Sequence, residues 1–293
     1  MFENSQKILV TGAGGFIASH LTESLAQAGH QVRAMVHYNF QNNWGWLETL
    51  PADVMENIEV FSGDIADPFA VQKGVEGCEL VFHLAALIAI PYSYLAPASY
   101  VETNVKGTLN VLEACRNSEV RRLVHTSTSE TYGTAQYTPI DEKHPLVGQS
   151  PYSASKIAAD KLAESYYLSF DLPVVTVRPF NTFGPRQSAR AVIPTIITQA
   201  LSGAETIHLG SLTPVRDLNY DKDTVAAIMA ATNAGNVVGK TINCGRGEGV
   251  SIGKLAQMIL EICGSMAEIV TEEKRVRPEK SEVMELICDN TLA

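Results

Sequence analysis

Two short runs of this chain carry side chains that could do acid–base chemistry on an alcohol. Tyr152 and Lys156 stand four residues apart, directly after the pair Ser150-Pro151, which is typical of a helix start. On a helix this spacing puts both side chains on one face, and an ammonium close to a phenol favours the phenolate and lowers its pKa. We therefore expect Tyr152 to be the base that takes the proton of an alcohol during its oxidation.

The second run, TSTSETYG, spans residues 126–133 and follows an apolar stretch that predicts a buried strand. It supplies the hydroxyl of Thr128 and, two residues further on, the carboxylate of Glu130. Ligands of a parallel α/β sheet bind outside the carboxyl ends of its strands, so both groups are expected to face the same crevice as Tyr152. In the alternative interpretation, Tyr152 and Lys156 are a surface pair and Glu130 is a carboxylate at a helix start.

The elements that must position these residues form an alternating pattern. Short apolar runs separated by helix-length segments predict a parallel sheet with helices on both faces. The expected fold class is α/β, a Rossmann-type doubly wound parallel sheet with a smaller C-terminal substrate-binding domain. The predicted strands are residues 7–10, 31–36, 58–62, 80–83, 121–126, 174–178 and 241–243.

The pattern loosens after the sixth predicted strand, and this change suggests a domain boundary. Residues 1–178, with a return segment of about 217–243, are assigned to the dinucleotide-binding domain. Residues 179–216 and 244–293 are assigned to the substrate domain. Proline- and glycine-punctuated runs, among them residues 214–217, are expected to be loops, and arginines gathered in them suggest recognition of phosphate or carboxylate groups.

The first predicted strand leads at once into the turn TGAGGFIASHL. Gly12 and Gly15 would let a pyrophosphate approach the backbone, and Phe16 and Ile17 begin a helix whose first N–H groups attract an anion. We therefore expect a bound dinucleotide. The second strand ends at His37 instead of the acid that usually contacts the ribose of NAD, and no arginine stands there for the 2′-phosphate of NADP. The residues therefore do not decide between the two; NAD is taken as the expected cofactor, with NADP as the alternative.

Further cofactor contacts are expected at the ends of other strands. Asp64 could accept a hydrogen bond from the adenine amino group or could merely cap a helix, whereas His83 is expected to be a satisfied core histidine. The small residues after the fourth strand suit close contact with a dinucleotide. The expected cofactor residues are Gly12, Gly15, Phe16, Ile17, His37, Asp64, Ile65, Leu84, Ala85, Ala86, Asn104, Tyr152, Lys156 and Pro179.

Composition narrows the functional classes. The chain has 293 residues, of which 45% are hydrophobic and 18% charged, as in an ordinary α/β protein with ample core. A formal net charge of -10 argues against nucleic-acid binding. The five cysteines form no C-x-x-C pair and are expected to be mostly buried thiols in a reducing compartment. No signal peptide and no apolar run long enough to span a bilayer is seen, so a cytoplasmic protein without membrane or metal sites is expected.

Taken together along the chain, several motifs resemble the extended short-chain dehydrogenases/reductases that act on nucleotide sugars. These motifs are the glycine turn, HLAA, Asn104, TSTSETYG, Tyr152-x-x-x-Lys156, RPFNTFGPR and a late Arg277-Pro278 pair followed by a glutamate. The triplet Thr128-Ser129-Glu130 looks like the signature of the 4,6-dehydratases and not that of the 4-epimerases. The run GPRQSARAVIPT and residues 38–46 look most similar to amino-sugar nucleotide 4,6-dehydratases of legionaminic-acid-type pathways.

The resemblance implies conversion of a UDP- or GDP-linked hexose, with N-acetylglucosamine favoured, to its 4-keto-6-deoxy form. Oxidation at C4 would be followed by loss of water across C5 and C6 and by return of the hydride to C6. The implied catalytic residues are Thr128, Glu130, Tyr152 and Lys156, with Ser129 where some dehydratases carry an acid. The implied substrate contacts are Asn181, Arg186, Arg216 and Arg277.

The resemblance also implies a homodimer in which the predicted helices of residues 98–116 and 153–170 pair across a two-fold axis, and a further helix beyond Ala293. The alternative activities are UDP-glucuronate decarboxylase, which shares a T-S-E segment, and nucleotide-sugar 4-epimerase. An alternative of another class is a non-catalytic dinucleotide sensor. Such sensors tend to lose the tyrosine or the lysine, and this chain keeps both.

Overall fold

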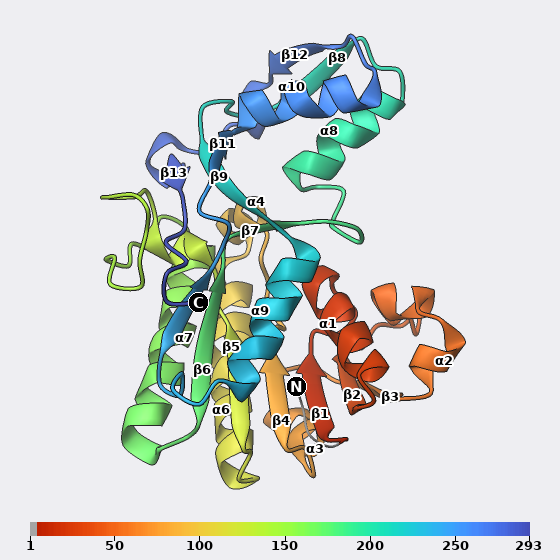
Figure 1. Cartoon of the computed structure of the whole chain (residues 1–293), viewed down its shortest axis with the longest axis vertical. Helices are drawn as coiled ribbons and strands as arrows, with labels where there is room; N and C mark the ends of the chain where they lie inside the picture. Colours follow the sequence, from red (N-terminus) through yellow and green to blue (C-terminus); the bar gives the residue numbers. More distant parts are fainter. Residues whose placement is uncertain (1–4) are drawn as a thin grey trace.

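A seven-stranded parallel sheet forms the centre of the computed structural model, which describes residues 5–293 (Figure 1). The strand order is β10-β6-β5-β4-β1-β2-β3, so the direction of winding reverses between β1 and β4. The predicted doubly wound α/β fold is confirmed, and all seven predicted strands are present. They are β1 (Lys7–Thr11), β2 (Gln31–Val36), β3 (Ile58–Ser62), β4 (Leu80–His83), β5 (Arg122–Thr126), β6 (Val174–Pro179) and β10 (Thr241–Cys244).

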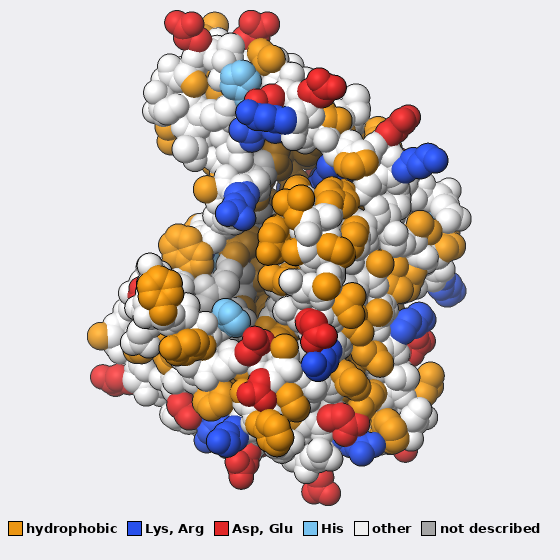
Figure 2. Space-filling view, turned by 180° about the vertical axis from the view of Figure 1, so that it is seen from behind, with side chains coloured by type: hydrophobic (Ala, Val, Ile, Leu, Met, Phe, Trp, Pro, Cys, Tyr) orange, Lys and Arg blue, Asp and Glu red, His pale blue; other side chains and the backbone are white. Residues whose placement is uncertain are grey.

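A smaller unit lies beyond the carboxyl ends of these strands, at the top of Figure 1, and Figure 2 shows a hollow between it and the larger unit. The prediction that residues 214–217 form a loop is wrong, because β9 begins at Val215 and pairs with three other short strands. The elements of the smaller unit are β7 (Asn181–Phe183), α8 (Val192–Leu201), β8 (Thr206–Leu209), β9 (Val215–Tyr220), β11 (Gly249–Ser251), α10 (Ile252–Cys263), β12 (Glu268–Thr271), η4 (Glu273–Arg275), η5 (Glu279–Ser281) and β13 (Glu285–Leu286).

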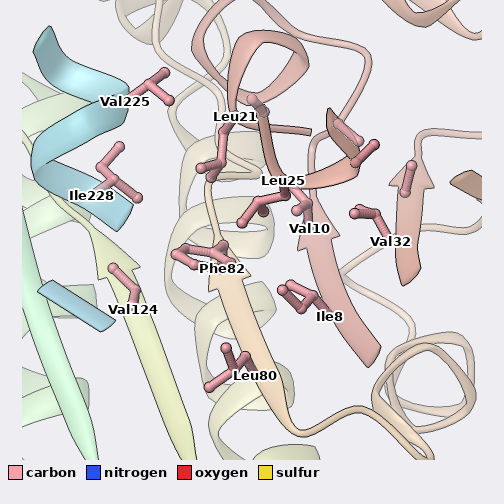
Figure 3. Packing of buried hydrophobic residues seen from close by; sticks show 14 of the residues in the cluster. Ile8, Val10, Leu21, Leu25, Val32, Leu80, Phe82, Val124, Val225 and Ile228 are labelled. Carbon is pink, nitrogen blue, oxygen red and sulfur yellow. The ribbon is translucent and has the colours of Figure 1, made fainter. Parts of the chain in front are cut away.

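Helices cover both faces of the large sheet. On one face, α1 (Phe16–Gln27) and α9 (Asp221–Asn233) bury Leu21 and Val225 against strand residues such as Val10 and Phe82 (Figure 3). The other face carries α3 (Pro68–Val75), α6 (Gly107–Asn117) and α7 (Pro151–Phe170). The short elements η1 (Gly45–Thr49) and α2 (Ala52–Met55) lie between β2 and β3. Burial on both faces explains why the strands read as continuous apolar runs.

The segment predicted as one helix, residues 98–116, is helical throughout but is not a single α-helix. It consists of α5 (Pro97–Tyr100), the π-helical turn η2 (Val101–Lys106) and α6, and it follows α4 (Ile90–Leu95). Within the π-helical turn, the side chain of Asn104 is buried. A π-helical turn inside a helix often marks a functional site. Within the described residues, no helix has both the length and the apolar character to cross a membrane.

Candidate active site

The helix that carries Tyr152 and Lys156 begins as predicted. Ser150 caps α7 by accepting a hydrogen bond from the backbone of Ser153 at 3.1 Å, Ser153 returns the bond in a capping box, and Pro151 occupies the first turn. Tyr152 and Lys156 are buried, with 7% and 4% of their surface exposed. This helix start therefore fixes both side chains at the carboxyl ends of the strands.

Burial, rather than the neighbouring ammonium, dominates the titration of Tyr152. Burial raises the pKa of Tyr152 above its ordinary value, a hydrogen bond with Thr128 lowers it, and the charge of Glu130 raises it. Lys156 donates its Nζ proton to the carbonyl of Thr126 at 2.8 Å, and burial lowers its pKa to about 8. The prediction that Lys156 lowers the pKa of Tyr152 is therefore wrong: burial raises this pKa, and Lys156 is not among the groups that shift it.

The turn after β5 brings the predicted carboxylate to the tyrosine. Thr128 caps η3 (Ser129–Tyr132), its Oγ1 accepting from the backbone N–H of Glu130 at 3.3 Å. Ser129 and Glu130 are buried in the same turn. A hydrogen bond with Thr128 and the charge of Glu130 both act on the pKa of Tyr152, so the three groups interact. The structure thus brings together Thr128, Glu130 and Tyr152, which come from two elements.

Two of the predicted substrate arginines meet at one carboxylate. Arg216, buried on β9, lies 3.5 Å from Oε1 of Glu282, and Arg277 lies 3.6 Å from the same oxygen. Burial lowers the pKa of Arg216, and the charge of Glu130 raises it. This arginine is therefore within electrostatic range of the turn formed by residues 128–132, the candidate catalytic turn. Paired guanidinium groups suit the bidentate recognition of phosphate oxygens. Glu282 was not among the predicted site residues.

The other two predicted substrate residues lie in different surroundings. Asn181 is the first residue of β7, and its Oδ1 is buried without a hydrogen-bond partner among the described residues, so it can bind a donor from a ligand. Arg186 instead forms an ion pair with Glu23 of α1 at 2.7 Å and also contacts Ser19. The structure therefore does not bring Arg186 to the other two arginines.

The glycine turn has the geometry that a pyrophosphate requires. Gly12 has φ +73°, and a Cβ there would lie 2.8 Å from the Cα of Ala85. Gly15 precedes α1 without a side-chain cap, so the first N–H groups of α1, from Phe16 and Ile17 onward, can face an anion. The hydroxyl of Thr11 accepts hydrogen bonds from the backbone N–H groups of Leu84 and Ala85, which fixes that loop against the turn. These residues fit a dinucleotide.

Three further predicted residues have partners within the protein. Both polar atoms of the Asn104 side chain bond Leu87, and its amide also bonds Ser155, so this side chain holds the loop beside the cofactor turn. Asp64 accepts from the backbone of Ala66, as a turn cap does. His83 bonds Thr11 and Thr108, which confirms that it is a satisfied core histidine. The remaining predicted residues line strand ends: His37, Ile65, Ala86 and Pro179.

Two features beside the site were not predicted from the sequence. The backbone of Trp46 donates to Gly14 at 3.0 Å, so the loop after β2 lies directly on the glycine turn. Behind Lys156, Asp160 and Arg178 form a buried ion pair at 2.7 Å. One usable signal was that Asp160 lies one helical turn after Lys156 and so shares its face.

Fold and site together define an extended short-chain dehydrogenase/reductase of the class that modifies nucleotide sugars. The sequence model of the GDP-mannose 4,6 dehydratase family matches residues 9–291, and this chain belongs to that family.

Three similar proteins represent three activities of this class. A dTDP-glucose 4,6-dehydratase of Actinoplanes is 32% identical, covering 92% of this chain and 86% of its own. A UDP-glucuronic acid decarboxylase of Xenopus tropicalis is 30% identical, covering 91% of this chain and 62% of its own. The crystal structure of a UDP-glucuronic acid 4-epimerase variant from Bacillus cereus, bound to NAD and a fluorinated UDP-sugar, has a TM-score of 0.89 at 28% identity and covers 98% of this chain and 91% of its own.

Proposed function

We propose that this chain is a nucleotide-sugar 4,6-dehydratase that acts on a UDP- or GDP-linked hexose, with N-acetylglucosamine as the favoured sugar. The observation that carries the proposal is the position of Glu130, a buried carboxylate whose charge acts on both Tyr152 and Arg216. A buried carboxylate within electrostatic range of both the proposed base and a proposed diphosphate-binding arginine is the candidate for removing a proton from the sugar ring.

The cofactor is NAD, which when bound at the glycine turn accepts a hydride from C4 of the sugar and returns it to C6. Tyr152 acts as a phenolate when it takes the proton of the C4 hydroxyl, so binding of cofactor and substrate has to offset the burial that raises its pKa. Thr128 donates a hydrogen bond to the C4 oxygen. The resulting ketone makes the C5 proton acidic, so Glu130 can remove it. A proton delivered to the C6 hydroxyl lets that oxygen leave as water. Because Ser129 is not an acid, Glu130 or a bound water supplies this proton. When the hydride returns to C6, C5 takes up a proton from water, and Tyr152 gives its proton back to water, so the sugar loses one water and the cofactor is unchanged.

Arg216 and Arg277 are proposed to hold the diphosphate, with the free Oδ1 of Asn181 as a further acceptor for the substrate. Positioning of this kind matters because bidentate contacts orient the sugar over Tyr152. The two guanidinium groups exchange part of their interaction with Glu282 for the phosphate oxygens.

Decarboxylation is the second candidate activity, because a decarboxylase is among the similar proteins and shares the T-S-E segment. That reaction also begins with oxidation at C4, but it needs an arginine at the sugar carboxylate and no base at C5. A 4-epimerase needs neither Glu130 nor loss of water. A non-catalytic sensor would bind NAD and leave every sugar nucleotide unchanged.

Product analysis by NMR tests these alternatives together. The purified protein is incubated with NAD and, separately, with UDP-N-acetylglucosamine, a GDP-hexose, dTDP-glucose and UDP-glucuronate. We expect a 4-keto-6-deoxy sugar from an amino-sugar nucleotide, without net formation of NADH. Carbon dioxide and a pentose nucleotide from UDP-glucuronate would instead assign the decarboxylase, and inversion at C4 alone would assign an epimerase.

We also propose that two copies associate through α7 and the helical segment of residues 97–117, as the resemblance implies. Exposed apolar side chains on these elements, among them Val101 and Leu168, support this proposal. A monomer in light scattering would contradict it. A cytoplasmic location is proposed as well, in keeping with five cysteines that are all free thiols.

A further inference from the structure

Three charged side chains are buried where α7 packs against the ends of β5 and β6. Lys156, Asp160 and Arg178 have 4%, 5% and 3% of their surface exposed. The proposed reaction uses Lys156 but neither of the other two. Burial of charged groups costs several kcal/mol per ion unless partners compensate them, so this placement needs an explanation.

Asp160 receives three hydrogen bonds, each from a different residue. Arg178 donates to its Oδ2 at 2.7 Å and the hydroxyl of Ser127 donates to the same oxygen at 2.6 Å. His125 Nε2 lies 3.0 Å from its Oδ1. Arg178 in turn donates to the hydroxyl of Tyr132 at 2.8 Å. The carboxylate is thus the centre of a polar network that joins α7, β5 and β6.

This network fixes the segment of chain that positions the catalytic groups. Lys156 donates to the carbonyl of Thr126, and Asp160, one helical turn later, bonds the side chains on either side of it, His125 and Ser127. Three successive residues of one strand end are therefore tied to two residues of α7. Because Thr128 follows directly, the same ties set where the catalytic turn leaves the sheet.

The two charged neighbours of Lys156 shift its pKa in opposite directions. Burial lowers its pKa to about 8, the charge of Asp160 raises it, and that of Arg178 lowers it. Burial alone would raise the pKa of Asp160, but the hydrogen bond from His125 and the charge of Arg178 hold it well below its ordinary value. The titratable groups that interact with Lys156 are Asp160 on α7, Arg178 on β6, His83 on β4 and His125 on β5, and Tyr152 lies one helical turn before it on α7.

The two buried histidines add no charge beside Lys156. Burial lowers the pKa of His83 well below its ordinary value and also lowers that of His125, so both are neutral at neutral pH. Asp160 is the carboxylate that acts on Lys156.

We propose that Asp160 is a positioning residue for the reaction: its charge keeps Lys156 protonated, and its hydrogen bonds hold Lys156 and the catalytic turn in place. The proposal rests on the role of Lys156 in the proposed function but not on the identity of the sugar.

Paired charge-removing variants test this role. Asp160→Asn leaves Arg178 without its counter-charge beside Lys156, so the alkaline limb of the pH–rate profile should move to lower pH by about one unit. Arg178→Gln leaves Asp160 unopposed, so the limb should move to higher pH. The double variant Asp160→Asn/Arg178→Gln removes both charges, and its limb should fall between those of the single variants.

Ser127→Ala is the matched structural control, because it removes one hydrogen bond to Asp160 and no charge. It should lower the midpoint of urea denaturation and leave the limb at the wild-type pH. A network with only a structural role would lower stability in all four variants without moving any limb, and that result would overturn the proposal. Limbs that move in the same direction in both single variants would also overturn it.

A direct titration separates this proposal from the proposed function. In protein labelled with ¹³C at the lysine Cε, the resonance of Lys156 is identified by its loss in Lys156→Arg. Its titration midpoint should fall in Asp160→Asn and rise in Arg178→Gln. If the wild type converts no sugar nucleotide but these midpoints shift, the proposed function fails and the role of Asp160 stands. If Asp160→Asn does not fold, Arg178→Gln decides, and an unchanged midpoint refutes the proposal.

Discussion

Substitution of Gly12 by alanine tests whether the glycine turn is shaped by close contact with the loop after β4. Gly12 has φ +73°, a conformation that costs an L-residue about 1–2 kcal/mol. The added Cβ would lie 2.8 Å from the Cα and 2.9 Å from the N of Ala85. These are backbone atoms that cannot rotate away, so overpacking adds about 1–3 kcal/mol. We expect Gly12→Ala to lower the free energy of unfolding by about 2–5 kcal/mol.

Gly29→Ala is the control, because Gly29 has φ +86° but nothing lies within 4 Å of the position of its Cβ. This variant should lose only the conformational part, about 1–2 kcal/mol. Urea denaturation of both variants gives the two free energies, and titration with NAD gives the affinity. The difference between the variants measures the contact with Ala85. Equal losses of stability, or undiminished NAD affinity in Gly12→Ala, would refute this account of the turn.

Three further outcomes are expected. Ser150→Ala removes the cap of α7 and should lower the free energy of unfolding by about 1 kcal/mol in urea denaturation. An unchanged midpoint would show that the cap does not stabilise the protein. Arg216→Lys loses bidentate contact and should raise KM for the sugar nucleotide roughly tenfold, about 1.4 kcal/mol, and an unchanged KM would remove this arginine from the diphosphate site. The lowered pKa of Asp160 gives stability that is complete above its ordinary value of about 3.9 and is lost as the pH falls below it. Denaturation at neutral and acid pH should show this loss in the wild type and less of it in Asp160→Asn.

The central sheet could be predicted from the sequence because its strands are buried on both faces. Residues 31–36, 58–62 and 80–83 were predicted with the bounds that the structure shows. The strand β9 was missed because it carries buried polar residues, among them Arg216 and Asp217, so it has no apolar pattern. Hydrophobic periodicity reports apolar burial, and a strand whose polar side chains are paired in the interior escapes it.

The candidate catalytic residues could be named from the sequence for a different reason, because Thr128, Glu130, Tyr152 and Lys156 lie in two local motifs. The network behind them was not, because Asp160 bonds residues on β5 and β6 that are distant in the sequence. The direction of the Tyr152 pKa shift was also wrong. Helical spacing shows which side chains share a face, but it does not show how deeply they are buried, and burial is the largest cause of that shift.

The most direct test of the central claim is the fate of the sugar in Glu130→Gln. The variant is mixed with the sugar nucleotide under single-turnover conditions, the reaction is quenched, and the mass of the sugar nucleotide is measured by mass spectrometry. If Tyr152 and Glu130 act in turn on one hexose, the variant should still produce the 4-ketohexose with its C6 oxygen retained, and the product lighter by one water should be absent. Formation of the dehydrated product at the wild-type rate would contradict the claim.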